Sequence, residues 1–557
     1  MVQTTGRLHP KTLDVGEYVT VGSALEASGT CIAASGPPAC RLPANDGKVM
    51  ASAGRSCGKS FPCSASIDLR VSRDPRQATL AAGLSLERLG NSLKRTIVVA
   101  LLCAVTAHTV SLAQTLTRDQ QLARDIYREL IEINTVTATG DTACAAEAMA
   151  ARLRGAGFVG EDVQVFNPAP HKGNLVARLR GTGVRRPILL LAHLDVVEAK
   201  REDWSVDPFK LLEQDGFFYG RGTGDDKFMA AVFVANLIRY KQEGFEPDRD
   251  ILLVLETDEE ILDRDGVGLQ WLVKNQRDLI DAEFALNEGG GVALKDGKAL
   301  RIGVQTSEKV PVNYVVEAKN SGGHSSLPTK DNAIYRLAEG LVRLARFDFP
   351  VQLNDTTRAW LERAGALEEL QVAADMRSIA SGQPVTGAVE RLSSKPVYNA
   401  QLRTTCVATM LEGGHAFNAL PQTARATVNC RVLPDESVEE VRKTLVRVLA
   451  DPQISVTPTW THVTSAPSLL EPSIMEPIGR LSAEFWPGAP VIPTMSAGAT
   501  DGSFLRNAGI PTYGHSGLAL DIVDVRFHGK HERVPIKSFY DGLEYQYRLV
   551  KALSSGK

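Results

Sequence analysis

The sequence lacks the features that mark several classes of protein. None of its eight cysteines belongs to a CxxC pair, so neither a thiolate zinc site nor a disulfide scaffold is expected. Neither sign of charge dominates, since 62 basic and 65 acidic residues leave a net charge of −3. This balance argues against the basic surface of a nucleic-acid-binding protein. The remaining composition, 43% hydrophobic and 23% charged over 557 residues, is that of a globular protein of roughly three or four domains.

The N-terminal region carries the pattern of an export signal. Residues 1–92 are rich in Gly, Ser and Pro and show no hydrophobic period, so we expect disorder or an over-extended start of the reading frame. In residues 93–113, Lys94 and Arg95 precede an apolar segment and a small-x-small triplet ends at Ala113, which is typical of a secretory signal peptide. A membrane anchor is the alternative, but the apolar run is short for a bilayer span. We therefore expect a periplasmic or secreted protein, cleaved near Ala113, without a stable membrane span.

Residues 188–291 place acidic and imidazole side chains at the ends of predicted buried strands. ILLLAHLDVVE is an apolar run that ends in polar residues, and ILLVLETDEE and AEFALNEGGG repeat this pattern, with GRGTGDDK and a helix between. Polar residues at the carboxyl ends of parallel strands build a site in an open α/β sheet. They are His193, Asp195, Asp225, Asp258, Glu259, Glu260 and Glu288.

This set of side chains predicts a metal site. One imidazole and several carboxylates suit a divalent ion, and a carboxylate can bridge two such ions about 3.5–4 Å apart. A second imidazole is needed, for which His515, His528 and His531 are the candidates.

The order of predicted elements divides the chain into regions. Helices alternate with apolar strands over 114–308, which predicts the first part of an α/β catalytic domain with a mostly parallel sheet. Residues 309–464 follow the order βαββαβ of a ferredoxin-like α+β unit, interrupted at 350–396 by a helical insertion of unassigned role. The α/β pattern returns over 465–557, so the ferredoxin-like unit is predicted to be inserted into the catalytic domain.

Several motifs occur together in one order: HLD, GRGTGDDK, TDEE, NEGG, GGHSSLP and HGKHERV. In this order they resemble the two-zinc exopeptidase family of glutamate carboxypeptidase, carboxypeptidase S, acetylornithine deacetylase and aminoacylase. The resemblance covers about residue 118 to the C-terminus. The DDK after GRGT, with GGHAFNALPQTARATVNCR, looks like the carboxypeptidase S and N-acyl-amino-acid hydrolase branch.

The resemblance implies a role for each side chain of the predicted metal site. Asp225 would bridge two divalent ions, zinc first and cobalt or manganese as alternatives, and Glu259 would be the general base. One ion would take His193 and Glu288, and the other Glu260 and His528. Asp195 would orient His193. The resemblance also implies a cis peptide bond between Asp225 and Asp226.

This sequence departs from the family pattern at two places. His531 stands where the family has Asn or Asp, which keeps it open as a ligand in place of His528. Residues 261–266 read ILDRDG, whereas the family usually has glycines directly after the acidic pair.

The resemblance further implies a substrate and a partner. His324 would stabilise the oxyanion, reaching from the small domain of a neighbouring subunit, so this domain would act as a lid and allow a homodimer. Asn418 and Arg431 would hold a free carboxylate, and the loop that contains Gly498 and Thr500 would contact the substrate backbone. The expected activity is hydrolysis of the amide bond of a short peptide or N-acyl amino acid with a free C-terminal carboxylate.

Each motif alone has a simpler interpretation. Glu259 and Glu260 could be solvated loop charges, His324 a turn residue, and Arg431 half of an interdomain ion pair. A metal-free binding or scaffold protein with the same fold remains an alternative, although no ligand has been lost. An aminopeptidase is a second alternative, which would need a site for a free amine in place of Asn418 and Arg431.

Overall fold

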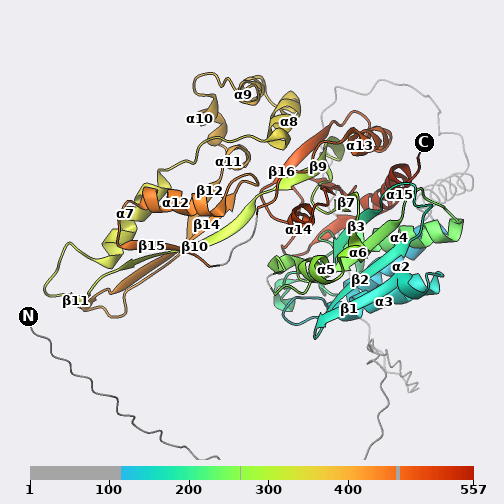
Figure 1. Ribbon diagram of the computed structural model, residues 1–557, viewed down its shortest axis with the longest axis horizontal. Helices are drawn as coiled ribbons and strands as arrows, with labels where there is room; N and C mark the ends of the chain where they lie inside the picture. The colour runs from blue at the N-terminus through green and yellow to red at the C-terminus, as the bar shows by residue number, and fades with distance from the viewer. Residues whose placement is uncertain (1–114, 264, 460–463, 557) are drawn as a thin grey trace, which may run out of the picture. The chain divides into compact units, whose positions relative to one another are not determined.

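The computed structural model describes residues 115–263, 265–459 and 464–556 (Figure 1). The predicted N-terminal extension (1–92) and signal peptide (93–113) lie outside the described residues. Within the described part of the chain, no helix is both long enough and apolar enough to cross a bilayer.

A ten-stranded sheet forms the centre of the α/β part of the protein. Its middle strands, β6, β3, β7 and β17, run parallel, and the strands at its edges pair mostly antiparallel. This arrangement confirms the predicted α/β fold class with a mostly parallel central sheet. In spatial order the strands are β1 (Val163–Ala169), β2 (Lys172–Leu179), β6 (Ile251–Glu256), β3 (Ile188–His193), β7 (Phe284–Asn287), β17 (Thr512–Gly514), β9 (Lys298–Glu308), β8 (Val292–Lys295) and β18 (Ala519–Asp521), with β16 (Val491–Ser496) also paired to β9.

Helices cover both faces of this sheet because alternate residues of its central strands face opposite ways. Leu190 and Leu253 belong to a hydrophobic core with one group of helices, whereas Leu189 and Leu252 belong to a core with another. The first group is α2 (Arg118–Glu132), α3 (Thr142–Gly155), α4 (Lys227–Glu243), α13 (Pro472–Phe485) and α15 (Ile536–Leu553). The second group is α5 (Leu269–Asn275), α6 (Arg277–Ile280) and α14 (Gly502–Asn507). Burial on both faces explains why these strands are almost wholly apolar in sequence.

Residues 310–458 contain a four-stranded antiparallel sheet in the order β12, β14, β10, β15. The elements follow one another as β10 (Val310–Lys319), α7 (Ala333–Ala345), β12 (Thr405–Gly413), β14 (Thr423–Val432), α12 (Val438–Leu449) and β15 (Ile454–Pro458), which is the βαββαβ order expected. Both helices pack on one face of the sheet and share a core with it. The short strands β11 (Gly323–His324) and β13 (Ala419–Leu420) pair beside it. The bounds of a separate domain stay a prediction.

A disulfide bond joins Cys406 to Cys430. The two residues lie directly opposite each other in the paired strands β12 and β14. Sequence analysis did not predict this bond, because strand register brings together two cysteines that are 24 residues apart.

The insertion within this region is helical, as its sequence indicates. It forms a small hydrophobic core of its own around Leu361, Met376 and Leu392, and α8 packs against β16. Its helices are α8 (Asp355–Ala364), α9 (Leu370–Ala380), α10 (Ala388–Ser393) and α11 (Pro396–Leu402).

Candidate metal centre

Two imidazoles flank the Asp225 carboxylate. Asp225 Oδ1 lies 3.1 Å from Nε2 of His193, which ends β3, and Asp225 Oδ2 lies 3.1 Å from Nε2 of His528. The same His528 nitrogen is 3.0 Å from Oε2 of Glu260. Ligand atoms of His193, Glu259 and Glu288, and of His193, Asp225 and Glu260, all lie within 4.8 Å of one another in each group. The structure thus brings together every side chain predicted for the metal site.

Burial and mutual repulsion perturb the acids of this cluster. Burial and the neighbouring Glu288 raise the pKa of Glu259 well above its usual range. Burial and Asp225 do the same to the pKa of Glu288. Burial opposes charge on Asp225 too, but hydrogen bonds from His193 and His528 hold its pKa below the usual value. Hydrogen bonds to Asp225 and Glu260 raise the pKa of His528 to about 10. The cluster therefore favours added positive charge.

The donor set fits divalent metal ions. Two atoms bound to one zinc ion at about 2.0–2.2 Å lie roughly 3.3–3.6 Å apart in tetrahedral geometry. The separations from Asp225 to the two imidazoles differ from this by a few tenths of an ångström. Glu260 Oε1 is buried and has no hydrogen-bond partner among the described residues. A buried carboxylate oxygen of this kind is satisfied by a cation.

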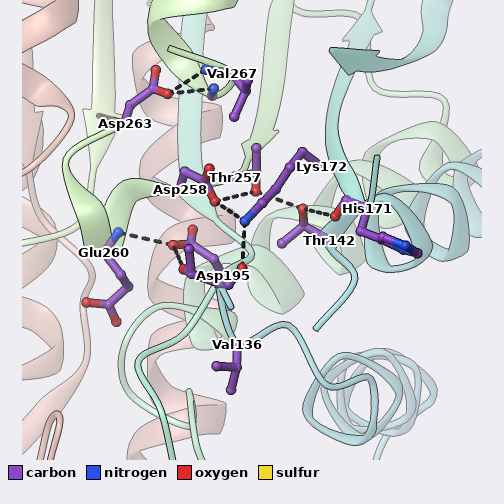
Figure 2. Close-up of polar contacts among 12 residues, drawn as sticks. Val136, Thr142, His171, Lys172, Asp195, Thr257, Asp258, Glu260, Asp263 and Val267 are labelled. Carbon is purple, nitrogen blue, oxygen red and sulfur yellow. Dashed lines mark hydrogen bonds and ion pairs between the residues drawn. The ribbon is translucent and has the colours of Figure 1, made fainter. Parts of the chain in front are cut away.

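Asp195 holds the turn that carries the acidic pair. Its Oδ1 accepts the backbone N–H of Glu259 at 3.2 Å. Its Oδ2 accepts the backbone N–H of Glu260 at 3.1 Å (Figure 2). His193 Nδ1 lies 3.0 Å from the backbone carbonyl of Asp195 and 3.6 Å from its carboxylate. Asp195 therefore positions the acidic turn with its carboxylate and contacts the His193 ring mainly through its backbone.

A buried ion pair fixes the start of the same turn. Lys172 Nζ donates to Asp258 Oδ1 at 2.6 Å and to the carbonyl of Thr137 at 2.9 Å (Figure 2). Asp258 is wholly buried and has a φ of 70°. The Lys172 contact offsets the cost of burying the Asp258 carboxylate.

The ILDRDG segment turns without the usual glycines. Leu262 and Asp263 adopt φ values of 56° and 42°, which a glycine would adopt at little cost. Asp263 stabilises this conformation because its carboxylate accepts the backbone N–H group of Val267 (Figure 2). It also accepts the backbone N–H groups of Gly268 and Gln270. Aspartate is among the few residues that tolerate a left-handed backbone.

Glu532 positions Asp225, and sequence analysis did not assign it a role. Strand β19 (Arg533–Pro535) pairs with β5 (Phe217–Tyr219), which brings Glu532 beside the GRGTGD loop. Its carboxylate accepts the N–H groups of Gly222, Gly224 and Asp225, and Arg221 Nη1 donates to it at 2.7 Å. A single buried carboxylate thus organises the backbone from which Asp225 projects. Its place in the HGKHERV motif was a sequence signal for it.

The peptide bond between Asp225 and Asp226 is cis, as the resemblance implies. Lys227, which follows, is buried, and its Nζ donates to the carbonyls of Leu130 at 2.8 Å and Ile133 at 2.9 Å. These carbonyls lie at the C-terminal end of α2, where a cation is favourable. The Lys of the DDK motif therefore has a structural role here.

The two other candidate imidazoles have different partners. His531 Nε2 lies 3.3 Å from Ser205 Oγ, and its ring packs edge-on against Trp204. His515 is buried between the carbonyl of Gly303 and the hydroxyl of Tyr545, and burial lowers its pKa to about 4. Of the three candidates, His528 is the one that contacts the carboxylate cluster.

The predicted substrate residues of the 309–464 region are separated. His324 pairs with Ala419 across β11 and β13, so Asn418 and His324 are neighbours, and both are exposed. Arg431 pairs with Pro311, at the opposite end of β14 from Thr423. Eight residues of strand span roughly 27 Å. Within one chain, Asn418 and Arg431 therefore lie far apart, and their shared role in binding the substrate carboxylate stays a prediction.

The predicted substrate loop lies partly at the site. Thr500 lines a cavity that Asp225 and Glu288 also line. Its hydroxyl is already used, because it donates to Glu308 at 2.8 Å and accepts from the backbone of Gly502. Gly498 is exposed and donates its N–H to Ser496 Oγ at 3.0 Å.

Two imidazoles and four carboxylates gathered at strand ends and on neighbouring loops are typical of a hydrolase of the metallopeptidase class. Residues 189–552 match peptidase family M20/M25/M40, so the chain belongs to that family. This result confirms the resemblance identified from the motifs.

The relatives include both peptidases and amidohydrolases. The chain is 30% identical over 374 residues to the N-fatty-acyl-amino acid synthase/hydrolase PM20D1 of Xenopus tropicalis, covering 66% of this chain and 72% of that protein. It is 28% identical over 381 residues to the probable carboxypeptidase S-like 2 of Dictyostelium discoideum, covering 66% and 71%. Its fold matches an M20 family metallo-carboxypeptidase from Sulfolobus solfataricus with a TM-score of 0.58 at 17% identity, covering 79% of this chain and 100% of that one.

Proposed function

We propose that this enzyme hydrolyses the amide bond of N-acyl amino acids or short peptides that carry a free C-terminal carboxylate, with two zinc ions. The observation that carries the proposal is the position of Asp225 between the imidazoles of His193 and His528. His193 and Glu288 would hold one ion, Glu260 and His528 the other, and Asp225 both. When bound, the ions supply acidity to a water molecule and polarise the carbonyl.

Glu259 suits the role of general base and then general acid. It is buried beside Glu288 and His193, within ligand distance of both. Burial shields the Glu259 carboxyl group from bulk water, so a proton that it accepts can pass to the departing nitrogen. Asp195 fixes its backbone, so the carboxyl group is held in place before the substrate arrives.

Glu259→Gln separates this role from metal binding. Replacing the carboxylate by an amide removes proton transfer, so kcat should fall by about 10² to 10⁴. Zinc content per chain, measured by mass spectrometry, should not change. Loss of zinc along with activity would make Glu259 a ligand and contradict its role as base.

Arg431 is suited to bind the substrate carboxylate. It is half-buried, and among the described residues no carboxylate lies within ion-pair distance of it. The interdomain ion pair considered as an alternative is therefore not formed. Burial lowers the pKa of the Arg431 guanidinium, and burial together with the nearby charge of Arg431 lowers the pKa of Lys309 to about 7. A half-buried guanidinium without a carboxylate partner among the described residues favours an anion over the free amine of an aminopeptidase substrate.

Arg431→Ala should raise KM for substrates with a free carboxylate. A hydrogen bond to a charged group contributes about 1.5–3 kcal/mol, so kcat/KM should fall roughly 10- to 150-fold. The matching amidated substrates should lose little. Arg425→Ala is the control, since Arg425 lies on the same strand and is paired with Glu317. Equal losses on both substrates would contradict carboxylate binding.

His324 and Asn418 would act on the site of a second copy of the chain. Their distance from Arg431 along β14, and their shared exposed position, support delivery by a neighbouring subunit. The edge strand β12 is exposed over most of its length and presents Val407, Met410 and Leu411 to solvent. Unpaired strand edges of this kind readily pair with another chain.

Mixing two inactive variants tests this arrangement. His324→Ala and Glu259→Gln chains, unfolded and refolded together, should regain about a quarter of wild-type activity, because half of the random dimers are mixed and each contains one complete site. Each variant refolded alone is the control. No recovery in a mixture shown to contain mixed dimers would place His324 in the site of its own chain.

We further propose that the enzyme is exported. The signal-peptide pattern of residues 93–113 supports this, and so does the Cys406–Cys430 disulfide, since disulfides persist in oxidising compartments. The mature chain from the native host should begin near Gln114, as measured by intact mass spectrometry. A chain that retains residues 93–113 would contradict cleavage.

A further inference from the structure

A cavity of about 550 Å³ begins at the metal centre and runs away from it along the sheet. Asp225 and Glu288 line one end. The rest is lined by β8, β9, β16 and β18 and by the segment that follows β18. Apart from its metal end and the loop that contains Thr500, this space has no role in the proposed hydrolysis of a minimal substrate.

Strand β9 forms the floor of the cavity with alternate residues. Ile302 and Val304 are buried in the core, so Arg301, Gly303 and Gln305 face the opposite way and line the cavity. A Cβ atom added to Gly303 would lie 3.6 Å from its nearest neighbour, the carbonyl oxygen of Gly291. The backbone at Gly303 would therefore tolerate a larger residue. The effect of glycine here is to leave the floor of the cavity free of a side chain.

Hydrocarbon side chains form the wall. Leu518, Leu520, Ile522, Val525 and Phe527 all line the cavity. Ile522 and Val525 are 43% and 52% exposed, which is unusual for residues of their kind. A Cβ atom at Gly224 would lie 2.1 Å from the Phe527 ring, so this ring covers the loop next to Asp225. These five side chains make one side of the cavity apolar, while Thr494, Ser496 and Ser516 contribute hydroxyl groups to its lining.

The floor strand gives the cavity a direction and a length. The Gln305 side chain packs over Gly289, next to Glu288, which marks the metal end. Arg301 is four residues away on the same face, roughly 13 Å along the strand. An extended chain advances roughly 1.2 Å per bond, because the three backbone bonds of a residue span about 3.3–3.6 Å. The floor therefore matches a straight chain of about ten carbons.

We propose, on the basis of the proposed function, that this cavity binds the acyl group of an N-acyl amino acid and measures its length. The acyl chain lies on Gly303 against the wall of Leu518, Leu520 and Ile522, and its end reaches Arg301 after about ten carbons. A peptide in the same place would bring an N–H and a C=O group every few ångströms, and those that face Leu518, Leu520 and Ile522 would stay unpaired. The cavity thus favours a medium-length aliphatic acyl group over a peptide.

A series of N-acyl derivatives of one amino acid, from acetyl to octadecanoyl, tests the proposal on the purified wild-type enzyme. Each added methylene that enters the cavity should raise kcat/KM about fourfold at most, and the rise should stop near ten carbons. Gly303→Val fills the floor beyond the first few carbons, so it should lower the ratio of decanoyl to acetyl kcat/KM by about tenfold or more. Val525→Ala should reduce the gain per methylene.

Val523→Ala is the matched control, because Val523 lies in the same segment but is 89% exposed and does not line the cavity. Its profile should equal that of the wild type. A wild-type profile that does not depend on acyl length, or a Gly303→Val variant that loses all lengths equally, overturns the acyl assignment and leaves the proposed hydrolase intact. Failure to hydrolyse any member of the series overturns both.

Discussion

The structure depends on the burial of several carboxylates within a few ångströms of one another. Glu259, Glu260 and Glu288 surround Asp225, and burial with mutual repulsion raises the pKa of Glu259 and of Glu288. Such a group is unfavourable unless cations neutralise it. The two imidazoles on Asp225 do so in part, and the orphaned oxygen of Glu260 shows that more positive charge is accommodated. A strongly acidic and geometrically ordered site of this kind is how a protein binds two divalent ions.

The surrounding fold serves to hold these acids in place. His193 and Glu288 come directly at or after strand ends, where backbone hydrogen bonding is already satisfied by the sheet. Asp225 and the acidic pair lie on loops, and each loop is tied down by a buried carboxylate that accepts backbone N–H groups, Glu532 for one and Asp195 for the other. Preorganised supports of this kind keep a catalytic group within the narrow range of positions that chemistry requires.

Local patterns in the sequence predicted the strand-end residues of the metal centre, whereas the choice of His528 among three histidines depended on the family resemblance. The apolar run before His193 predicts one buried strand, and the run before the acidic pair predicts another. In both cases the polar residues indicate where the strand ends. The alternation of helix and strand likewise predicted the sheet and the order of elements in the 309–464 region. The supporting roles of Glu532 and Lys227 could not be predicted, since their partners are distant in the chain.

Strand pairing and tertiary contacts account for the other features that could not be predicted from the sequence. Asn418 and Arg431 lie 13 positions apart in sequence, yet the strand between them separates them in space. The Cys406–Cys430 disulfide likewise depends on how β12 pairs with β14. Left-handed turns at Leu262 and Asp263 replace expected glycines, because the Asp263 carboxylate provides the hydrogen bonds that stabilise them. The position of Gly303 on the floor of the cavity could be inferred only from the structure, because it follows from the burial of Ile302 and Val304 in the core.

The most direct test of the central claim is anomalous diffraction at the zinc edge from crystals of the enzyme supplied with zinc. The account predicts two peaks about 3.5–4 Å apart, one between Asp225 and His193 and one between Asp225 and His528. No anomalous peak at Asp225, or a single ion that His528 does not contact, would contradict it.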